Sequence, residues 1–76
     1  MTIIRVALDV PIDRLFDYTF EEASATDVGL RTRVPFGKRD LIGIILEVCT
    51  ETTIATDKLR PAHQIYHEIS PLPSDL

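Results

Sequence analysis

Glycine and cysteine are scarce in this sequence of 76 residues. Its three glycines stand at positions 29, 37 and 43, which is not the glycine-rich, lysine-bearing loop that an ATPase needs to hold phosphates. The single cysteine, Cys49, excludes an internal disulfide, and nothing indicates secretion. We therefore expect a cytoplasmic protein that hydrolyses no nucleotide within these residues.

Long hydrophobic runs and an excess of positive charge are also missing. The longest apolar stretch, Leu41 to Leu46, is far too short to span a bilayer, and the first residues do not form a signal peptide. Eight basic and twelve acidic residues give a net charge of -4, whereas proteins that coat duplex phosphates usually present a basic face. These absences argue against a membrane partner and against a broad phosphate-binding surface.

Few side chains suit covalent catalysis or metal binding. Cys49 could meet His63 or His67, but a lone thiol that ends a strand is more often a small buried apolar residue. The two histidines would bind a metal together on a helix, whereas on a strand they lie about 13 Å apart at a rise of roughly 3.3 Å per residue. We expect no catalytic residue, no metal and no cofactor.

The residues that are present describe one small globular domain. Hydrophobic residues make up 45% of the chain and charged residues 26%, which is the composition of a soluble protein with one modest core. We expect this module to span residues 1–70. The proline and serine content from Ser70 to Ser74 is typical of a linker, so residues 71–76 should be a linker or the start of the next segment of a longer chain.

Five short segments have the composition or alternation of strands. The segment from Leu41 to Cys49 is apolar on both faces and should be central, and Gly43 within it indicates a bulge or a close approach of a backbone or ligand. Pro35 should place its strand end at an edge or a bulge. The other segments are Ile3 to Val10, Leu15 to Phe20, Arg31 to Phe36 and Pro61 to Ile69.

The connections between these segments are short. The stretch from Glu21 to Asp27 should be a loop or one helical turn, Gly29 a turn and Phe36 to Asp40 a hairpin loop. The stretch from Glu51 to Asp57 is predicted to be a turn or a short helix capped by Thr56 or Asp57. The pattern predicts an all-β fold, a small antiparallel barrel-like or rolled sheet of five or six strands, similar to an OB fold.

One strand gathers three aromatic rings on one face. Phe16, Tyr18 and Phe20 alternate with polar neighbours, so Asp17 points the opposite way. Rings on one strand face are core residues by default, and we expect at least two of these three in the core.

Two motifs carry a resemblance to a known family. They are Leu15-Phe16-Asp17-Tyr18 and the run from Arg31 to Lys38, which includes Arg-Val-Pro-Phe-Gly-Lys. With Val6-Ala7-Leu8, Gly29, Ile42-Gly43-Ile44-Ile45 and Lys58-Leu59-Arg60-Pro61, they resemble in order and spacing the N-terminal 3′-end DNA-binding domains of primosomal protein N′, a bacterial replication-restart helicase. The resemblance covers nearly the whole chain.

This resemblance implies a non-enzymatic module of an ATP-dependent DNA helicase that acts at stalled replication forks. It implies a pocket for the last nucleotide of a strand with a free 3′-OH, formed by Phe16, Asp17, Tyr18, Gly37 and Arg60. The family usually has lysine at the position of Arg60, and arginine keeps the charge but changes its shape. The implied partners are DNA with a free 3′-OH end, single-stranded or at a fork, other domains of the same helicase and primosome proteins. We expect a monomer.

The chemistry of these residues fits an end-binding pocket. Asp17 offers an acceptor to the terminal hydroxyl, and hydrogen bonds to charged groups contribute roughly 1.5–3 kcal/mol. Phe16 or Tyr18 could stack on the last base, and Gly37 would let the chain approach the sugar. The candidate basic rim consists of Arg31, Arg33, Lys38 and Arg39.

Other interpretations of the same residues stay open. Asp17 could be a solvated strand residue, and the basic residues could belong to a solvated hairpin. The main alternative is a small β-barrel that docks protein partners and has no DNA role, and an enzyme ranks third.

Overall fold

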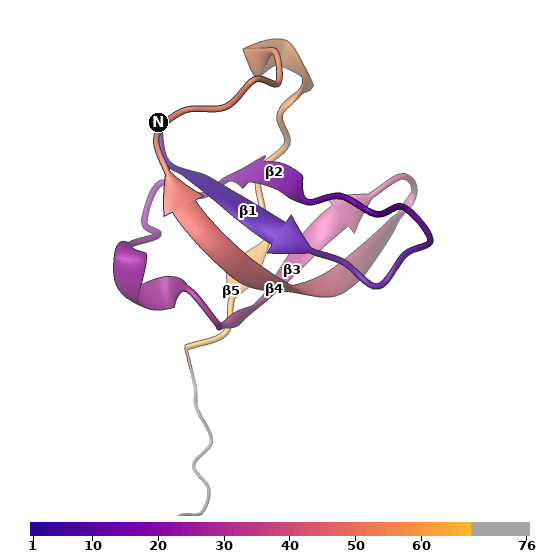
Figure 1. The fold of residues 1–76 in the computed structure, drawn as a ribbon, viewed down its shortest axis with the longest axis horizontal. Coiled ribbons are helices and arrows are strands. Elements are labelled where there is room, and N and C mark those ends of the chain that lie inside the picture. The colour runs from indigo at the N-terminus through magenta and orange to yellow at the C-terminus, as the bar shows by residue number, and fades with distance from the viewer. Residues whose placement is uncertain (68–76) are drawn as a thin grey trace, which may run out of the picture.

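The computed structural model describes residues 1–67, and within them the chain forms one rolled antiparallel sheet (Figure 1). The expected linker at 71–76 lies outside the described residues. The strands run in the order β2-β1-β4-β3-β5 across the sheet. The expected all-β class is confirmed, with β4 at the centre. The five strands of the described part are β1 (Ile3–Ala7), β2 (Phe16–Thr19), β3 (Arg31–Phe36), β4 (Arg39–Cys49) and β5 (Gln64–Ile65).

Helical structure in residues 1–67 is limited to two single turns of 3₁₀ helix, η1 (Ala25–Asp27) and η2 (Thr56–Lys58). Neither these nor any other described segment makes a helix long and apolar enough to cross a membrane. Of the two alternatives expected for Glu21 to Asp27, a loop or one helical turn, the structure has a loop that ends in the single turn η1. Gly29 follows it with a φ of 96°, a conformation that glycine adopts without a steric penalty.

The segment that leads into β5 joins the two edges of the rolled sheet. The backbone N–H of Thr19 in β2 donates to the Arg60 carbonyl at 3.0 Å, and the Ala62 N–H donates to the Thr19 carbonyl at 2.9 Å. One residue later, the His63 N–H donates to the Arg33 carbonyl of β3 at 2.8 Å. The sheet is therefore barrel-like, although no continuous ladder within residues 1–67 closes it.

The core lies inside this roll and is built from alternating strand positions. Tyr18 is only 5% exposed and belongs to the core, whereas Phe16 and Phe20 are half-buried and pack against it. We expected at least two of the three rings in the core, but only Tyr18 is buried there, and Phe16 and Phe20 form its margin. The other members of the core cluster are Ile4, Val6, Val34, Ile45, Ala62 and Ile65.

The sequence predicted either a bulge or a close backbone approach at Gly43. Strand β4 has both features, but at different residues. Arg5 pairs with Glu47 while the next residue of β1 pairs with Ile45, so Leu46 is the extra residue of a bulge. Gly43 instead marks a close approach of β1. A Cβ atom there would lie 2.5 Å from a methyl group of Val6 and 2.7 Å from the Ala7 carbonyl oxygen.

Three sequence expectations need correction. The β3–β4 turn is tighter than expected: Phe36 pairs with Arg39, so only Gly37 and Lys38 form the loop, and the positive φ of Gly37 (63°) suits a two-residue turn. The helix η2 begins after Ala55, which caps it without a side-chain hydrogen bond.

The last strand is also shorter than the expected Pro61 to Ile69. Within the described residues only Gln64–Ile65 pairs as a strand. Ala62 and Ile65 are both buried, three positions apart, because the chain bends at His63 as it passes from β2 to β3. That bend interrupts the alternation from which the longer strand was predicted.

Candidate nucleic-acid interface

A cleft of about 510 Å³ opens beside β2, an outer strand of the sheet. Phe16, Asp17 and Tyr18 all line it, although they alternate along the strand. Because no further strand of the described residues pairs along the outer side of β2, side chains from both of its faces can reach the same space. The full lining consists of Arg5, Arg14, Leu15, Phe16, Asp17, Tyr18, Thr53, Ile54 and Lys58.

The net charge of the residues that line this cleft is positive, whereas the net charge of the whole chain is negative. Arg5, Arg14 and Lys58 contribute three cations to the lining, and Asp17 contributes one carboxylate. The chain as a whole has a net charge of -4. The basic residues that matter for an anionic ligand are thus gathered locally, from three segments that are distant in sequence.

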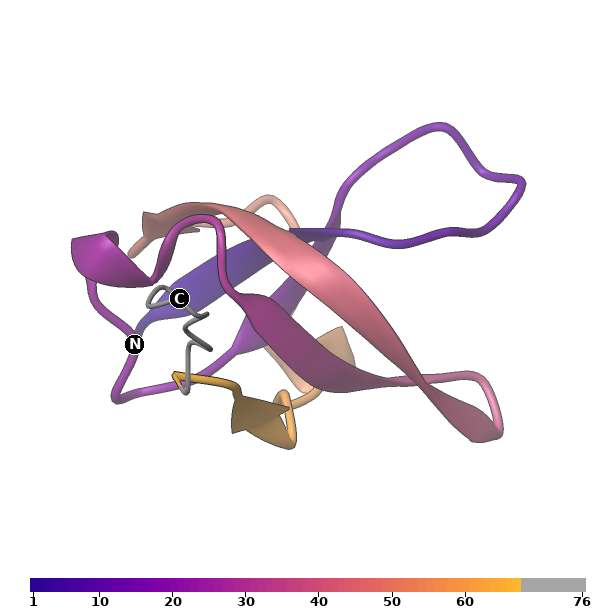
Figure 2. The same ribbon diagram turned by 90° about the horizontal axis from the view of Figure 1, so that it is seen from below.

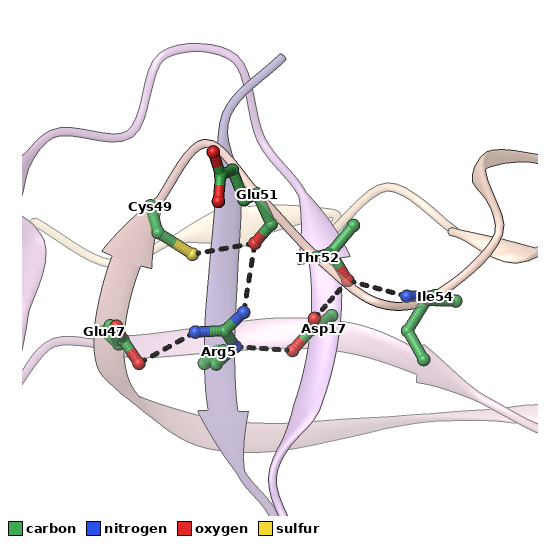
Figure 3. A network of polar contacts seen from close by, with 7 residues as sticks. All are labelled: Arg5, Asp17, Glu47, Cys49, Glu51, Thr52 and Ile54. Atoms are coloured by element: carbon green, nitrogen blue, oxygen red, sulfur yellow. Dashed lines mark hydrogen bonds and ion pairs between the residues drawn. The ribbon is translucent and has the colours of Figure 1, made fainter.

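Asp17 is held by two internal hydrogen bonds (Figure 3). The Nε atom of Arg5 donates to Oδ1 of Asp17 at 3.1 Å, and the hydroxyl of Thr52 donates to Oδ2. The Asp17 side chain is only 10% exposed. The alternative interpretation of Asp17 as a freely solvated strand residue is therefore wrong. The Asp17 carboxylate has a fixed orientation at the cleft.

Arg5 occupies the centre of this network because of strand register. It pairs with Asp17 on one side and with Glu47 on the other, so the three side chains form one row across β2, β1 and β4. Its other two guanidinium nitrogens donate to Glu47 Oε1 and to the Glu51 carbonyl, both at 3.0 Å. The hydrogen bond to Glu47, followed by the charge of Asp17, raises the pKa of Arg5 above its ordinary value.

The aromatic side of the cleft is formed by Phe16, which lies against two other side chains. Its ring makes an edge-to-face contact with Phe36 at a centroid distance of 5.3 Å. The Arg14 guanidinium lies over the Phe16 ring at 4.9 Å from its centroid, within the range of a cation–π contact. Phe16 is half-buried and lines the cleft, with a cation already beside it.

Tyr18 contributes to the same wall from the core. Its hydroxyl donates to the Pro35 carbonyl at 2.9 Å, which ties β2 to the end of β3. Burial raises the pKa of Tyr18, while the positive charge of Arg60 acts in the opposite direction. Arg60 thus lies near this ring, although it is not among the residues that line the cleft.

Gly37 is also displaced from the cleft lining. It follows Phe36, whose ring touches Phe16, and it forms the tip of the β3–β4 hairpin. Figure 2 shows this hairpin and the long β1–β2 connection projecting from the same end of the molecule. The structure brings three of the five predicted pocket residues together and leaves Gly37 and Arg60 beside them.

None of the four predicted rim residues lines the cleft. Arg31 lies at the start of β3, while Lys38 and Arg39 lie at the hairpin tip. Arg33 forms an exposed ion pair with Asp40 at 3.1 Å. The four residues thus extend from the start of β3 to the hairpin tip and the first residue of β4.

The two histidines point to different carboxylates. His63 shares a hydrogen bond with Asp40, and His67 shares one with the buried Asp27, each at 3.0 Å. No group of three potential metal ligands occurs among residues 1–67. Cys49 is half-buried, and its thiol donates to the Glu51 carbonyl at 3.4 Å.

Comparison with known proteins shows the family of this chain. The family model of the PriA 3′ DNA-binding domain (3′BD) matches residues 5–76. The chain is 40% identical over 60 residues to the replication restart protein PriA of Haemophilus influenzae, a match that covers 79% of this chain and 8% of that protein. It is 33% identical over 55 residues to PriA of Buchnera aphidicola, with 72% and 8% covered. This chain belongs to the PriA 3′ DNA-binding domain family.

As a PriA 3′ DNA-binding domain, the chain is a DNA-binding module, and the DNA-binding role expected from the resemblance is confirmed over the pure interaction module. It spans 8% of the length of these two PriA relatives. Arg5, Arg14 and Thr52 are among the residues of the cleft and its network that sequence reasoning missed. Lys58 was named only within the motif Lys58-Leu59-Arg60-Pro61, in which Arg60 was the expected cation.

Proposed function

We propose that this domain binds the last nucleotide of a DNA strand in the cleft beside β2, with Asp17 accepting a hydrogen bond from the free 3′-OH. The observation that carries the proposal is the convergence of Phe16, Asp17 and Tyr18 with three cations on one cleft. In this role the domain would serve an ATP-dependent helicase that restarts replication at stalled forks in the bacterial cytoplasm.

Asp17 keeps enough acceptor capacity for this task. A carboxylate offers about four lone-pair sites, and Arg5 and Thr52 occupy one on each oxygen. The remaining sites can accept from a hydroxyl. A phosphate at the same position would place an anion beside the carboxylate, so the site should distinguish a 3′-OH end from a 3′-phosphate end.

The ring of Phe16 supplies a surface for the terminal base. Base–aromatic stacking contributes roughly 1–3 kcal/mol per base and tolerates every base. A base on the face that Arg14 covers would displace its guanidinium, which could then meet a backbone phosphate. Stacking and phosphate binding would thus be linked at this residue.

The cations near the cleft suit a small number of phosphates. Lys58 lines the cleft, Arg60 lies beside Tyr18, and both would contact the backbone without reading a base. Since each neutralised phosphate contributes a slope of about 0.7 in log K against log salt for single strands, binding should depend weakly on salt. Gly37 and the hairpin residues would approach the strand farther from its end.

The experiment is fluorescence anisotropy with labelled single strands that end in a 3′-OH or a 3′-phosphate. Wild type should bind the hydroxyl end and reject the phosphate end. Asp17→Asn keeps the shape and one acceptor but removes the charge, so it should narrow this difference without unfolding the domain. Asp40→Asn makes the same chemical change on the exposed hairpin and serves as the control. Equal binding of both ends by wild type, or undiminished discrimination by Asp17→Asn, would contradict the proposal.

The domain also has a surface suited to other parts of the helicase. Ile42, Ile44 and Leu46 are 48%, 37% and 49% exposed on the outer face of β4, and this chain spans 8% of its PriA relatives. We propose that another domain of the same polypeptide covers this face, and that the module itself is a monomer without enzymatic activity. A photo-crosslinker at position 44 in the full-length helicase should form intramolecular crosslinks, and their absence would contradict this contact.

A further inference from the structure

Arg5 is the residue on which the geometry of Asp17 depends, although it lies on another strand. Its guanidinium has three acceptors from three segments: Asp17 on β2, Glu47 on β4 and the Glu51 carbonyl in the loop after β4. Figure 3 shows the guanidinium between them. A planar fork with fixed donor directions can hold three such acceptors at once.

The loop after β4 completes the enclosure of Asp17. Thr52 donates its hydroxyl to the carboxylate and accepts from the Ile54 N–H at 3.1 Å. Its neighbours Thr53 and Ile54 line the cleft. The bond from Arg5 to the Glu51 carbonyl therefore fixes the loop that carries one wall of the cleft, in addition to the carboxylate itself.

We infer that Arg5 is a positioning residue for 3′-end recognition, which orients the Asp17 carboxylate toward the terminal hydroxyl and anchors the Glu51–Ile54 wall. This inference rests on the proposed function. Two fixed hydrogen bonds leave the carboxylate with defined free acceptor directions, so little orientation has to be achieved on binding. The arginine, which Asp17 shares with Glu47, also offsets part of the Asp17 charge beside an anionic strand.

A structural role alone would predict a different pattern of effects. If Arg5 only joined three strands, its loss would lower stability and weaken all binding in proportion to unfolding. A positioning role predicts that binding loses its dependence on the 3′-hydroxyl while the folded domain persists. The informative measurement is therefore the ratio of affinities for a 3′-OH end and a 3′-deoxy end, which differ by that hydroxyl alone.

The experiment measures this ratio for wild type and variants of the domain, with thermal unfolding in parallel. Wild type should favour the 3′-OH end by about tenfold, the equivalent of one charge-assisted hydrogen bond. Arg5→Lys keeps the charge but loses the fork, so its ratio should fall toward one. Thr52→Val removes the hydroxyl that donates to Asp17 and accepts from Ile54, and it should lower the ratio by less. Glu47→Gln changes an acceptor that is 53% exposed and outside the cleft lining, and it should keep the wild-type ratio.

A double-mutant cycle with Asp17→Asn isolates the connection between the two residues. If Arg5 acts through Asp17, adding Arg5→Lys to Asp17→Asn should not lower the ratio further. A folded Arg5→Lys variant with the full wild-type ratio, or a further independent loss in the double variant, would overturn the inference. A wild-type ratio of one would instead refute the proposed end recognition itself.

Discussion

The cleft beside β2 and the β3–β4 hairpin both contain an arginine–aspartate pair, yet the two pairs differ in their surroundings. In the cleft, Arg5 and Asp17 are 27% and 10% exposed and accept or donate further hydrogen bonds. In the hairpin, Arg33 and Asp40 are 41% and 45% exposed. Exposed pairs contribute roughly 0–1 kcal/mol because water and side-chain entropy compete with them.

This difference teaches that clustering of charge along the sequence does not locate the ordered site. The hairpin has the densest run of basic residues, whereas the cleft gathers its cations from β1, the β1–β2 connection and η2. Pairing across strands creates the ordered network. The hairpin charges remain at the surface.

Gly43→Ala should destabilise the cleft and the hairpin together, because β4 pairs with β1 beside the cleft and with β3 in the hairpin. It should cause the largest loss of folding stability. The added methyl group would meet Val6 and the backbone of Ala7 at distances below 3 Å, and overpacking of this kind typically costs about 1–3 kcal/mol. Urea unfolding would measure the loss. Ile42→Ala, on the exposed face of the same strand, is the control and should cost less. Equal stability of Gly43→Ala and wild type would show that β1 can move away freely.

Arg60→Ala should weaken binding to every strand end by about tenfold, the range of one charge-assisted contact. The loss should be independent of the terminal base, because a cation near the backbone carries no base code. Titrations with four strands that differ only in the last base would check this, with the exposed Arg31→Ala as the control. A much larger loss for one base would mean that Arg60 reads a base edge.

Tyr18→Phe removes the hydrogen bond from the Tyr18 hydroxyl to the Pro35 carbonyl. This bond joins the cleft beside β2 to the end of β3. We expect a loss of about 0.5–1.5 kcal/mol, the usual net contribution of such a bond. End selectivity should persist, because Asp17 and Arg5 are unchanged.

Tyr18 should also make the stability of the domain depend on pH in the alkaline range. Burial raises the pKa of Tyr18, so the folded state holds the phenolic proton more tightly than the unfolded state does. Its contribution is complete below pH about 10, the ordinary tyrosine value, and is lost as the pH rises through the folded-state pKa. Tyr18→Phe should flatten this decline. Identical profiles for wild type and Tyr18→Phe would contradict the assignment.

Much of the fold could be predicted from local sequence signals. The apolar run of β4, the turn at Gly29 and the alternation of β3 all reflect rules that act over a few residues. The last strand was mispredicted because backbone pairing with both β2 and β3 bends the chain at His63. The alternation of apolar and polar residues within a segment does not show that its backbone changes partner from β2 to β3.

The residues of the cleft likewise include some that local sequence signals predicted and some that they did not. Phe16, Asp17 and Tyr18 were found through a contiguous motif, whereas Arg5 faces Asp17 only because of the β1–β2 register. The connection between β1 and β2 spans residues 8–15, and a loop of this length does not fix the register as a two-residue turn does. The partner of Asp17 therefore could not be read from the sequence.

Lys38→Gln tests whether the hairpin contacts DNA outside the cleft. Loss of one phosphate contact should lower the salt slope by about 0.7 and slightly weaken binding to all ends alike. Anisotropy titrations at several salt concentrations would measure the slope. Thr26→Gln, on the exposed η1 turn, should leave it unchanged. A slope that Lys38→Gln does not alter would remove the hairpin tip from the DNA interface.

Asp40→Asn should have the smallest effect and gives the sharpest contrast with Asp17→Asn. Asp40 contacts Arg33 and His63, but all three side chains are more than a third exposed, so the expected loss of stability is about 0–1 kcal/mol. That loss should vanish at high salt, since ions screen exposed charges effectively. The preference for a 3′-OH end should be unchanged. A larger or salt-independent loss, or a change in end preference, would mean that the hairpin network is as firmly fixed as the cleft and takes part in end recognition.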